Sequence, residues 1–252
     1  MRHLVFALLT LTGCAASRAS MPTLRPFAVS EAPVLEENHF TRDRVAMGED
    51  HLREILAAPI FLEENARIGV LPVSNGYAPE FEVPVEKVPA ALAAALDGSG
   101  LFAQSSELSS DFPITAGIGG LRELAARYRT EYLLLYRHRF SDAAHGNPLA
   151  AFYVTILGAF VVPGTTVESS GVLEATLFDV KTGTILFTVY ERVSREGLSP
   201  PPAVEQRWRD MHQEMVAEAQ SKLADQVLAQ LNRLVASRPR NTRNAVVQNS
   251  PE

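Results

Sequence analysis

A single cysteine, Cys14, occurs among the 252 residues of the chain. One thiol cannot form an intramolecular disulfide, so buried apolar surface alone has to hold the folded part together. Cys14 follows a positively charged start, Met1-Arg2-His3, and a short apolar run, residues 4–11, which is the layout of a secretory signal. That run is much shorter than the roughly 20 residues that a transmembrane helix needs. The fold is therefore expected to lie after residue 14 and to depend on a hydrophobic core.

The residues around the cysteine, Leu11-Thr12-Gly13-Cys14, resemble the lipobox of bacterial lipoproteins. The resemblance implies cleavage between Gly13 and Cys14 and attachment of a diacylglycerol to the Cys14 thiol. The next residue is Ala15 rather than Asp, which in Gram-negative lipoproteins implies the outer membrane. The alternative is an ordinary secretory signal cut at another site, with Cys14 removed or left as a free thiol.

Composition indicates one folded domain with irregular ends. Residues 15–44 carry Pro22, Pro26 and Pro33 without a sustained apolar period, and the last residues are polar. We therefore expect a signal peptide at 1–13, a lipidated N-terminus and flexible tether at 14–44, a single globular domain at 45–236 and a disordered tail at 237–252. Such a tether has a root-mean-square span of roughly 30 Å. The formal net charge of −6, with no dense basic stripe, argues against nucleic acid as a partner.

Apolar periodicity predicts alternating strands and helices. The expected helices are 45–57, 88–96, 117–128 and 203–235, and the expected strands are 66–73, 101–108, 132–136, 171–179 and 184–195. A polar loop is expected at 141–148, and Gly183 is expected at positive φ in the hairpin turn. The order is β-α-β-α-β, an apolar insertion, a β-hairpin and a long C-terminal helix. It predicts an α/β (α+β) sandwich with a mixed β-sheet and helices mainly on one face.

The apolar insertion, Leu149 to Val162, has two interpretations. Most apolar runs of this length are core, and a buried hairpin or helix is the first expectation. The alternative is an exposed element that contacts lipid or a partner, since a large exposed apolar patch is unusual on a solitary domain. The side chains that would make this contact are Phe152, Tyr153, Ile156, Leu157, Phe160 and Val161.

Motifs that carry catalysis are absent from the sequence. It contains no Gly-x-Ser-x-Gly elbow, no Walker loop, no His-Glu-x-x-His and no cysteine pair. His51 and Glu54 lie one helical turn apart without a third ligand, and Arg137, His138 and Arg139 are interpreted as solvated side chains at a sheet edge. Trp208 is expected to be a core anchor. We therefore predict no catalytic residue, no metal site, no cofactor and no enzymatic activity.

A family resemblance accompanies the apolar insertion. Residues 121–139, the block from Tyr153 to Gly164 and the following hairpin resemble the rhombotarget lipoproteins of proteobacteria. Those proteins carry an aromatic-x-Thr-Ile-x-Gly-Ala-aromatic-x-x-Pro-Gly block before an Asp-containing hairpin. The resemblance covers about residues 115–190 and implies a compartment but no mechanism. The β-α-β-α-β core is also similar in layout to the domain of curli secretion lipoproteins and of lipoprotein activators of penicillin-binding proteins.

These features predict a function without catalysis. The first expectation is an outer-membrane lipoprotein, anchored by lipid on Cys14 and facing the periplasm, whose domain docks an envelope protein partner. The alternative is an oligomeric assembly or secretion component in which residues 149–163 meet the membrane or neighbouring subunits, so a homo-oligomer is a possible partner.

Overall fold

The computed structural model describes residues 48–58, 60–73, 83–109 and 117–237. The expected signal peptide, Gly13, Cys14 and the tether at 14–44 lie outside these residues, as does nearly all of the expected tail. The helices are α1 (Glu49–Ala57), α2 (Lys87–Gly98), α3 (Ile118–Tyr128), η2 (Pro148–Val154), α4 (Ile156–Val161), η3 (Pro201–Ala203) and α5 (Val204–Ala236), and the strands are β1 (Arg67–Pro72), β2 (Gln104–Glu107), β3 (Tyr132–Gly146), β4 (Thr165–Asp179) and β5 (Thr184–Ser199).

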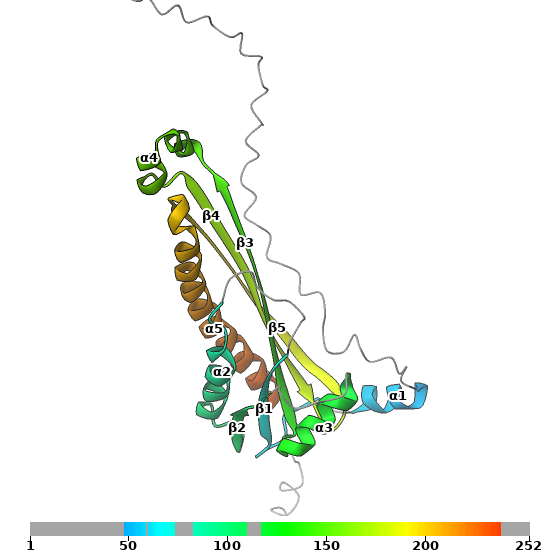
Figure 1. Ribbon diagram of the computed structural model, residues 1–252. Coiled ribbons are helices and arrows are strands. Elements are labelled where there is room, and N and C mark those ends of the chain that lie inside the picture. The colour runs from blue at the N-terminus through cyan, green and yellow to red at the C-terminus, as the bar shows by residue number, and fades with distance from the viewer. Residues whose placement is uncertain (1–47, 59, 74–82, 110–116, 238–252) are drawn as a thin grey trace, which may run out of the picture.

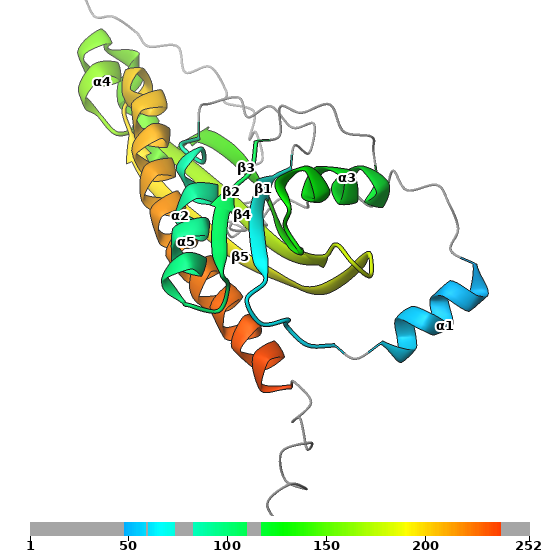
Figure 2. The same cartoon turned by 90° about the horizontal axis from the view of Figure 1, so that it is seen from below.

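The strands form one mixed sheet in the order β2-β1-β3-β4-β5. β1 pairs in parallel with β2 and β3, whereas β3, β4 and β5 form an antiparallel meander. Two helices, α2 and α5, cover one face of the sheet, and α3 packs against the other (Figure 1, Figure 2). The predicted α/β (α+β) fold with a mixed sheet, helices mainly on one face and a long C-terminal helix is confirmed.

Beyond residue 136 the sheet narrows into a ribbon of three strands. β1 pairs with β3 only as far as Tyr136, while β3 stays paired with β4 up to the pair of Gly146 with Thr165. At about 3.3 Å per residue, the 15 residues of β3 span about 50 Å. In Figure 1 the ribbon and α5 run side by side away from the wide end of the sheet, where α3 and the β4–β5 turn lie. We call that end the base.

The predicted polar loop at 141–148 is wrong for most of its length. β3 continues through Ser141 to Gly146, and β4 begins at Thr165 rather than at residue 171. The reason is that beyond Tyr136 this part of β3 is a sheet edge in the described structure, and polar side chains are compatible with a half-exposed edge strand. Its pairing partner lies some twenty residues away, so local composition did not indicate it.

The core lies between the sheet and α5. Residues Leu134, Tyr136 and Phe140 of β3 face Met215, Ala219 and Leu223 of α5, and all of them are buried. A smaller cluster under α3 joins Leu121 and Leu124 to Leu133, Leu135 and Phe178. Trp208 is half-buried against the main core, and its indole Nε1–H donates to the Glu168 carbonyl over 3.3 Å. This agrees with the expected anchoring role.

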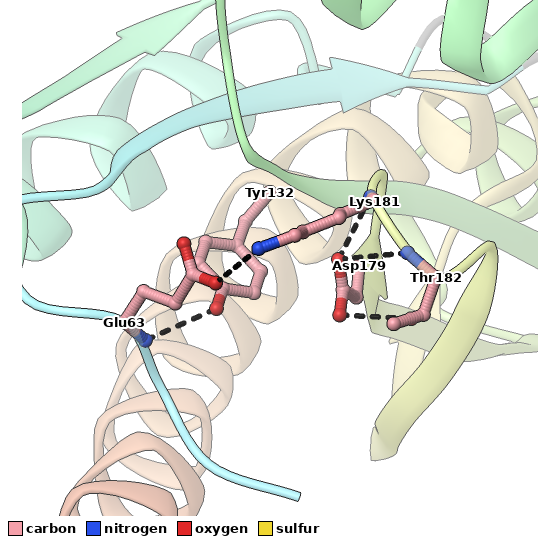
Figure 3. A network of polar contacts seen from close by, with 5 residues as sticks. All are labelled: Glu63, Tyr132, Asp179, Lys181 and Thr182. Atoms are coloured by element: carbon pink, nitrogen blue, oxygen red, sulfur yellow. Dashed lines mark hydrogen bonds and ion pairs between the residues drawn. The ribbon is translucent and has the colours of Figure 1, made fainter. Parts of the chain in front are cut away.

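The β4–β5 turn closes the base of the sheet (Figure 3). Asp179 Oδ1 accepts a bond from the Lys181 backbone N–H at 2.9 Å, and Thr182 Oγ1 donates to Asp179 Oδ2 at 2.8 Å. Gly183 has φ +74°, a left-handed conformation that favours glycine, so its predicted role in the turn is confirmed. Lys181 Nζ also lies 3.0 Å from Glu63 Oε1, which ties the segment before β1 to this turn.

Candidate contact surface: the apolar tip

The β3–β4 connection forms a small helical cap at the end of the ribbon farthest from the base (Figure 1). Residues 147–164 include η2 and α4, and we call them the apolar tip. α4 also contacts η3, which precedes the first turn of α5, so the tip sits across the ends of both the ribbon and the long helix. No other helix described here extends to this end in either view (Figure 1, Figure 2).

Asn147 fixes the entry to the tip. Its Oδ1 accepts a bond from the Leu149 backbone N–H at 2.9 Å and thereby caps η2. Its Nδ2 donates to the Pro163 carbonyl at 3.0 Å, and its backbone N–H donates to the Gly164 carbonyl at 2.8 Å. One asparagine therefore joins both ends of the tip and starts the first helical turn.

Thr155 and Tyr153 fix the middle of the tip. Thr155 is the N-cap of α4, and its Oγ1 accepts a bond from the Gly158 N–H at 3.0 Å. The Tyr153 hydroxyl lies 3.2 Å from Thr165 Oγ1 at the start of β4. Gly164 lets the ring approach, since a Cβ there would lie 2.6 Å from Tyr153 Cζ and 2.6 Å from the Ala150 nitrogen. The tip is thus an ordered element with an internal scaffold.

Apolar side chains point outward from this scaffold. Val154 is 92% exposed, Ile156 81% and Leu157 79%, and the other large exposed apolar residues of the tip are Leu149, Phe152, Phe160 and Val161. The first expectation for this segment, burial in the domain's core, is therefore wrong. Five of the six predicted contact residues, Phe152, Ile156, Leu157, Phe160 and Val161, are exposed together.

Tyr153 is the exception among the predicted contact residues. It is half-buried, and its ring and hydroxyl pack against the start of β4. The sequence analysis did not single out the scaffold residues, Asn147, Thr155 and Gly164. Their sequence signals were present, because Asn before Pro, Thr three residues before Gly, and Pro-Gly are typical of helix caps and turns.

Charge is absent from the tip. Residues 147–164 contain no Asp, Glu, Lys, Arg or His. The polar side chains in this range are those of Asn147, Tyr153 and Thr155, and each of them bonds within the tip or to Thr165. The outer surface of the tip therefore offers apolar contact and very little side-chain hydrogen bonding.

Behind the tip, a buried polar cluster joins α5 to the ribbon. His212 is fully buried, and its Nε2 lies 2.8 Å from Asp142 Oδ1 and 3.1 Å from Ser169 Oγ. A hydrolase triad would place the serine on one ring nitrogen and the carboxylate on the other, whereas both partners here share Nε2. Ser169 is also buried and has no access to a substrate. This geometry indicates a structural contact between helix and sheet.

The interpretation of Arg137, His138 and Arg139 as solvated side chains is wrong for Arg137. Its guanidinium forms two bonds of 2.7 Å to the Glu174 carboxylate, and both side chains are nearly buried. His138 stacks on Tyr136 with ring centroids 5.7 Å apart, and burial lowers the pKa of the imidazole although Glu86 opposes that shift.

Within the described residues, no group of three or more His, Cys, Asp and Glu could hold a metal ion.

Comparisons with known proteins show no family for this chain. No family model matches the chain, and no curated protein matches it. Similar solved structures include a PelC dodecamer from Paraburkholderia phytofirmans (14% identity over 66% of this chain and 92% of that chain, TM-score 0.33) and a minor lipoprotein from Acinetobacter baumannii (10%, 67% and 93%, 0.36). Another is the LpoB C-terminal domain from Salmonella enterica (15%, 57% and 91%, 0.28). Such low identities and scores transfer neither an activity nor a partner to this chain.

None of the helices in the described ranges is both long and apolar enough to cross a membrane.

Proposed function

We propose that this chain is a non-catalytic outer-membrane lipoprotein, anchored through Cys14, whose domain faces the periplasm and acts by contact. In this proposal the apolar tip docks another component of the cell envelope. The observation that carries the proposal is the outward display of seven large apolar side chains on a cap whose polar side chains are internally bonded. Compartment and anchor rest on the lipobox resemblance at Leu11 to Cys14.

The size of the exposed surface supports a contact role. A fully buried Leu, Ile or Phe side chain contributes about 1.5–3 kcal/mol relative to an exposed one. Seven such side chains left largely in water forgo on the order of 10 kcal/mol of burial, which is comparable to the whole stability of a domain. Apolar patches of several hundred Å² on monomeric proteins are commonly functional. The scaffold around Asn147 and Thr155 keeps this patch in place rather than allowing it to collapse onto the sheet.

Photo-crosslinking in cells tests the contact. A photoreactive amino acid at Leu157 should give a specific crosslinked product in envelopes, whereas the same group at Ile185 should not. Ile185 is the matched control because it is also an exposed apolar side chain but lies at the other end of the sheet. Equal crosslinking from both positions, or none from Leu157, would contradict the docking role of the tip.

The anchor has a separate test. Cys14→Ser should leave the chain unprocessed or release most of it from the outer-membrane fraction, because the Cys14 lipid is its proposed main anchor and several acyl chains hold a protein nearly permanently in a bilayer. The melting temperature of the domain should not change, since all described elements begin after residue 47. Recovery of Cys14→Ser in the outer-membrane fraction at the parental level would refute lipid anchoring.

A second candidate function is the oligomeric assembly. The long β5 strand favours it, because β5 is an edge strand of the described sheet and an unpaired edge can pair with another chain. Charged residues along β5, among them Glu191, Arg192 and Glu196, work against such pairing. Mass measurement after detergent extraction separates the candidates: a defined ring supports assembly, and a monomer supports docking by a single chain.

A further inference from the structure

We infer that the occupant of the apolar tip is the hydrocarbon of a lipid bilayer, so that the domain is held at the membrane by the tip as well as by its lipid. This inference rests on the proposed contact function and names the partner of that same site. Four features favour lipid over a protein surface: three concern the described residues, and the fourth is the length of chain that precedes them.

The first feature is hydrogen bonding. Protein–protein interfaces carry about one hydrogen bond per 100–200 Å² and a polar rim. The tip has no charged side chain, and Asn147, Tyr153 and Thr155 are already bonded within it or to Thr165. A protein partner would find few side-chain groups to pair with, whereas hydrocarbon requires none.

The second feature is shape. The exposed side chains come from both η2 and α4, and four of them, Val154, Ile156, Leu157 and Val161, leave more than two thirds of their surface open. The tip is a protruding end of the molecule (Figure 1, Figure 2). A bilayer surrounds such an end on all sides, but a protein would need a matching deep socket.

The third feature is depth. The six residues of α4 form a helix about 9 Å long, at about 1.5 Å per residue. Apolar faces of interfacial elements enter the boundary between headgroups and acyl chains by about 5–10 Å. On the two strands that lead into and out of the tip, the first ionisable side chains are His145 and Glu168, whose Nδ1 and Oε1 atoms lie 3.9 Å apart, and they would remain at the level of the headgroups.

The fourth feature is reach. α1 lies toward the base, far from the tip (Figure 1). The sequence places 33 residues between Cys14 and Gly48, and an extended chain of that length reaches over 100 Å. That exceeds the length of β3, about 50 Å, so a lipid on Cys14 and the tip can enter the same leaflet.

A fluorescence experiment tests the inference on residues 14–252 carrying Cys14→Ser, which retain all described elements. This chain has no other cysteine, so Leu157→Cys can be labelled alone with an environment-sensitive dye. Titration with phosphatidylcholine vesicles should shift the dye emission to the blue and raise its intensity several-fold. Ile185→Cys with the same label should change little. High salt should leave the Leu157→Cys response intact, since no charge lies in the tip.

A variant and a competing outcome complete the test. Ile156→Asp should weaken vesicle binding at least tenfold, whereas Ile185→Asp should not. A Leu157→Cys signal unaffected by phosphatidylcholine vesicles, or abolished by high salt, would overturn lipid insertion. If the dye responds instead to self-association, or if Leu157 crosslinks only to a protein, the occupant is a protein and the docking function stands without the lipid. If neither lipid nor protein contacts the tip, the proposed function fails as well.

Discussion

Phe160→Asp tests most directly whether the apolar tip is surface or core. Phe160 is 63% exposed, so little more than a third of its surface is buried by the fold. Full burial of such a side chain contributes about 1.5–3 kcal/mol, and a third of that is about 0.5–1 kcal/mol. Asp adds a few tenths of a kcal/mol in the last turn of α4, where a negative charge opposes the helix dipole. The expected total loss is about 1 kcal/mol, or about 2–4 °C in melting temperature.

Leu173→Asp is the matched control on the same ribbon. Leu173 is fully buried on the face covered by α5, so the substitution leaves an unpaired carboxylate in the core. Its cost should be several kcal/mol and should unfold the domain. Urea and thermal unfolding of the soluble Cys14→Ser chain, followed by circular dichroism, would compare the two variants. A loss above about 3 kcal/mol for Phe160→Asp would refute the exposed placement of the tip.

Three further predictions concern the sheet. Gly183→Val should lower the free energy of unfolding by about 1 kcal/mol or more, because a β-branched residue is strained at φ +74°. Gly183→Asn should lower it less. Equal melting temperatures for the parent and Gly183→Val would show that the turn does not need glycine. Arg137→Met should cost about 3–5 kcal/mol by leaving Glu174 buried without its partner, and adding Glu174→Leu should recover most of that loss in a urea-unfolding cycle. Burial lowers the pKa of His138 below its ordinary value of 6.5, so the unfolded state binds the proton more readily and stability should fall as the pH drops through about 6.5. His138→Phe should flatten that part of the pH profile of unfolding, and an unchanged slope would contradict it.

Local sequence was sufficient to predict the elements that are buried along the whole of one or both faces. The run from Leu133 to Leu135 is apolar on both sides, as a strand covered by helices on both faces has to be, and β3 does lie between the two clusters there. The regular spacing of Met211, Met215, Ala219 and Leu223 predicted α5, and these residues face the sheet. In both cases the apolar pattern that determines the burial of the element lies within the element's own residues.

The ribbon could not be predicted in this way. Residues 141–146 are strand because their backbone groups pair with residues 165–170. That pairing is a property of two segments separated by the tip, and it places polar side chains at an edge where water accepts them. The buried Arg137–Glu174 pair has the same origin, since the two residues are register partners on β3 and β4. From sequence alone, an arginine followed by more polar residues indicates a solvated end.

The apolar tip shows why hydrophobicity predicts burial without locating it. An apolar run indicates that a segment is more stable out of water, but burial in a core, against a partner or in a bilayer satisfies this preference equally. The caps decide between these outcomes. Asn147, Thr155 and Gly164 hold residues 147–164 as two short helical turns joined back to β4, which is too short an element to cover a sheet and too ordered to be a collapsed loop. A core segment would need an apolar surface opposite it, but the face of the ribbon near the tip is already covered by the first turns of α5, where Asp142, Ser169 and His212 are in contact. The side chains of Ile156 and Leu157 therefore point into solvent. The dye experiment at position 157 tests whether lipid contacts them there.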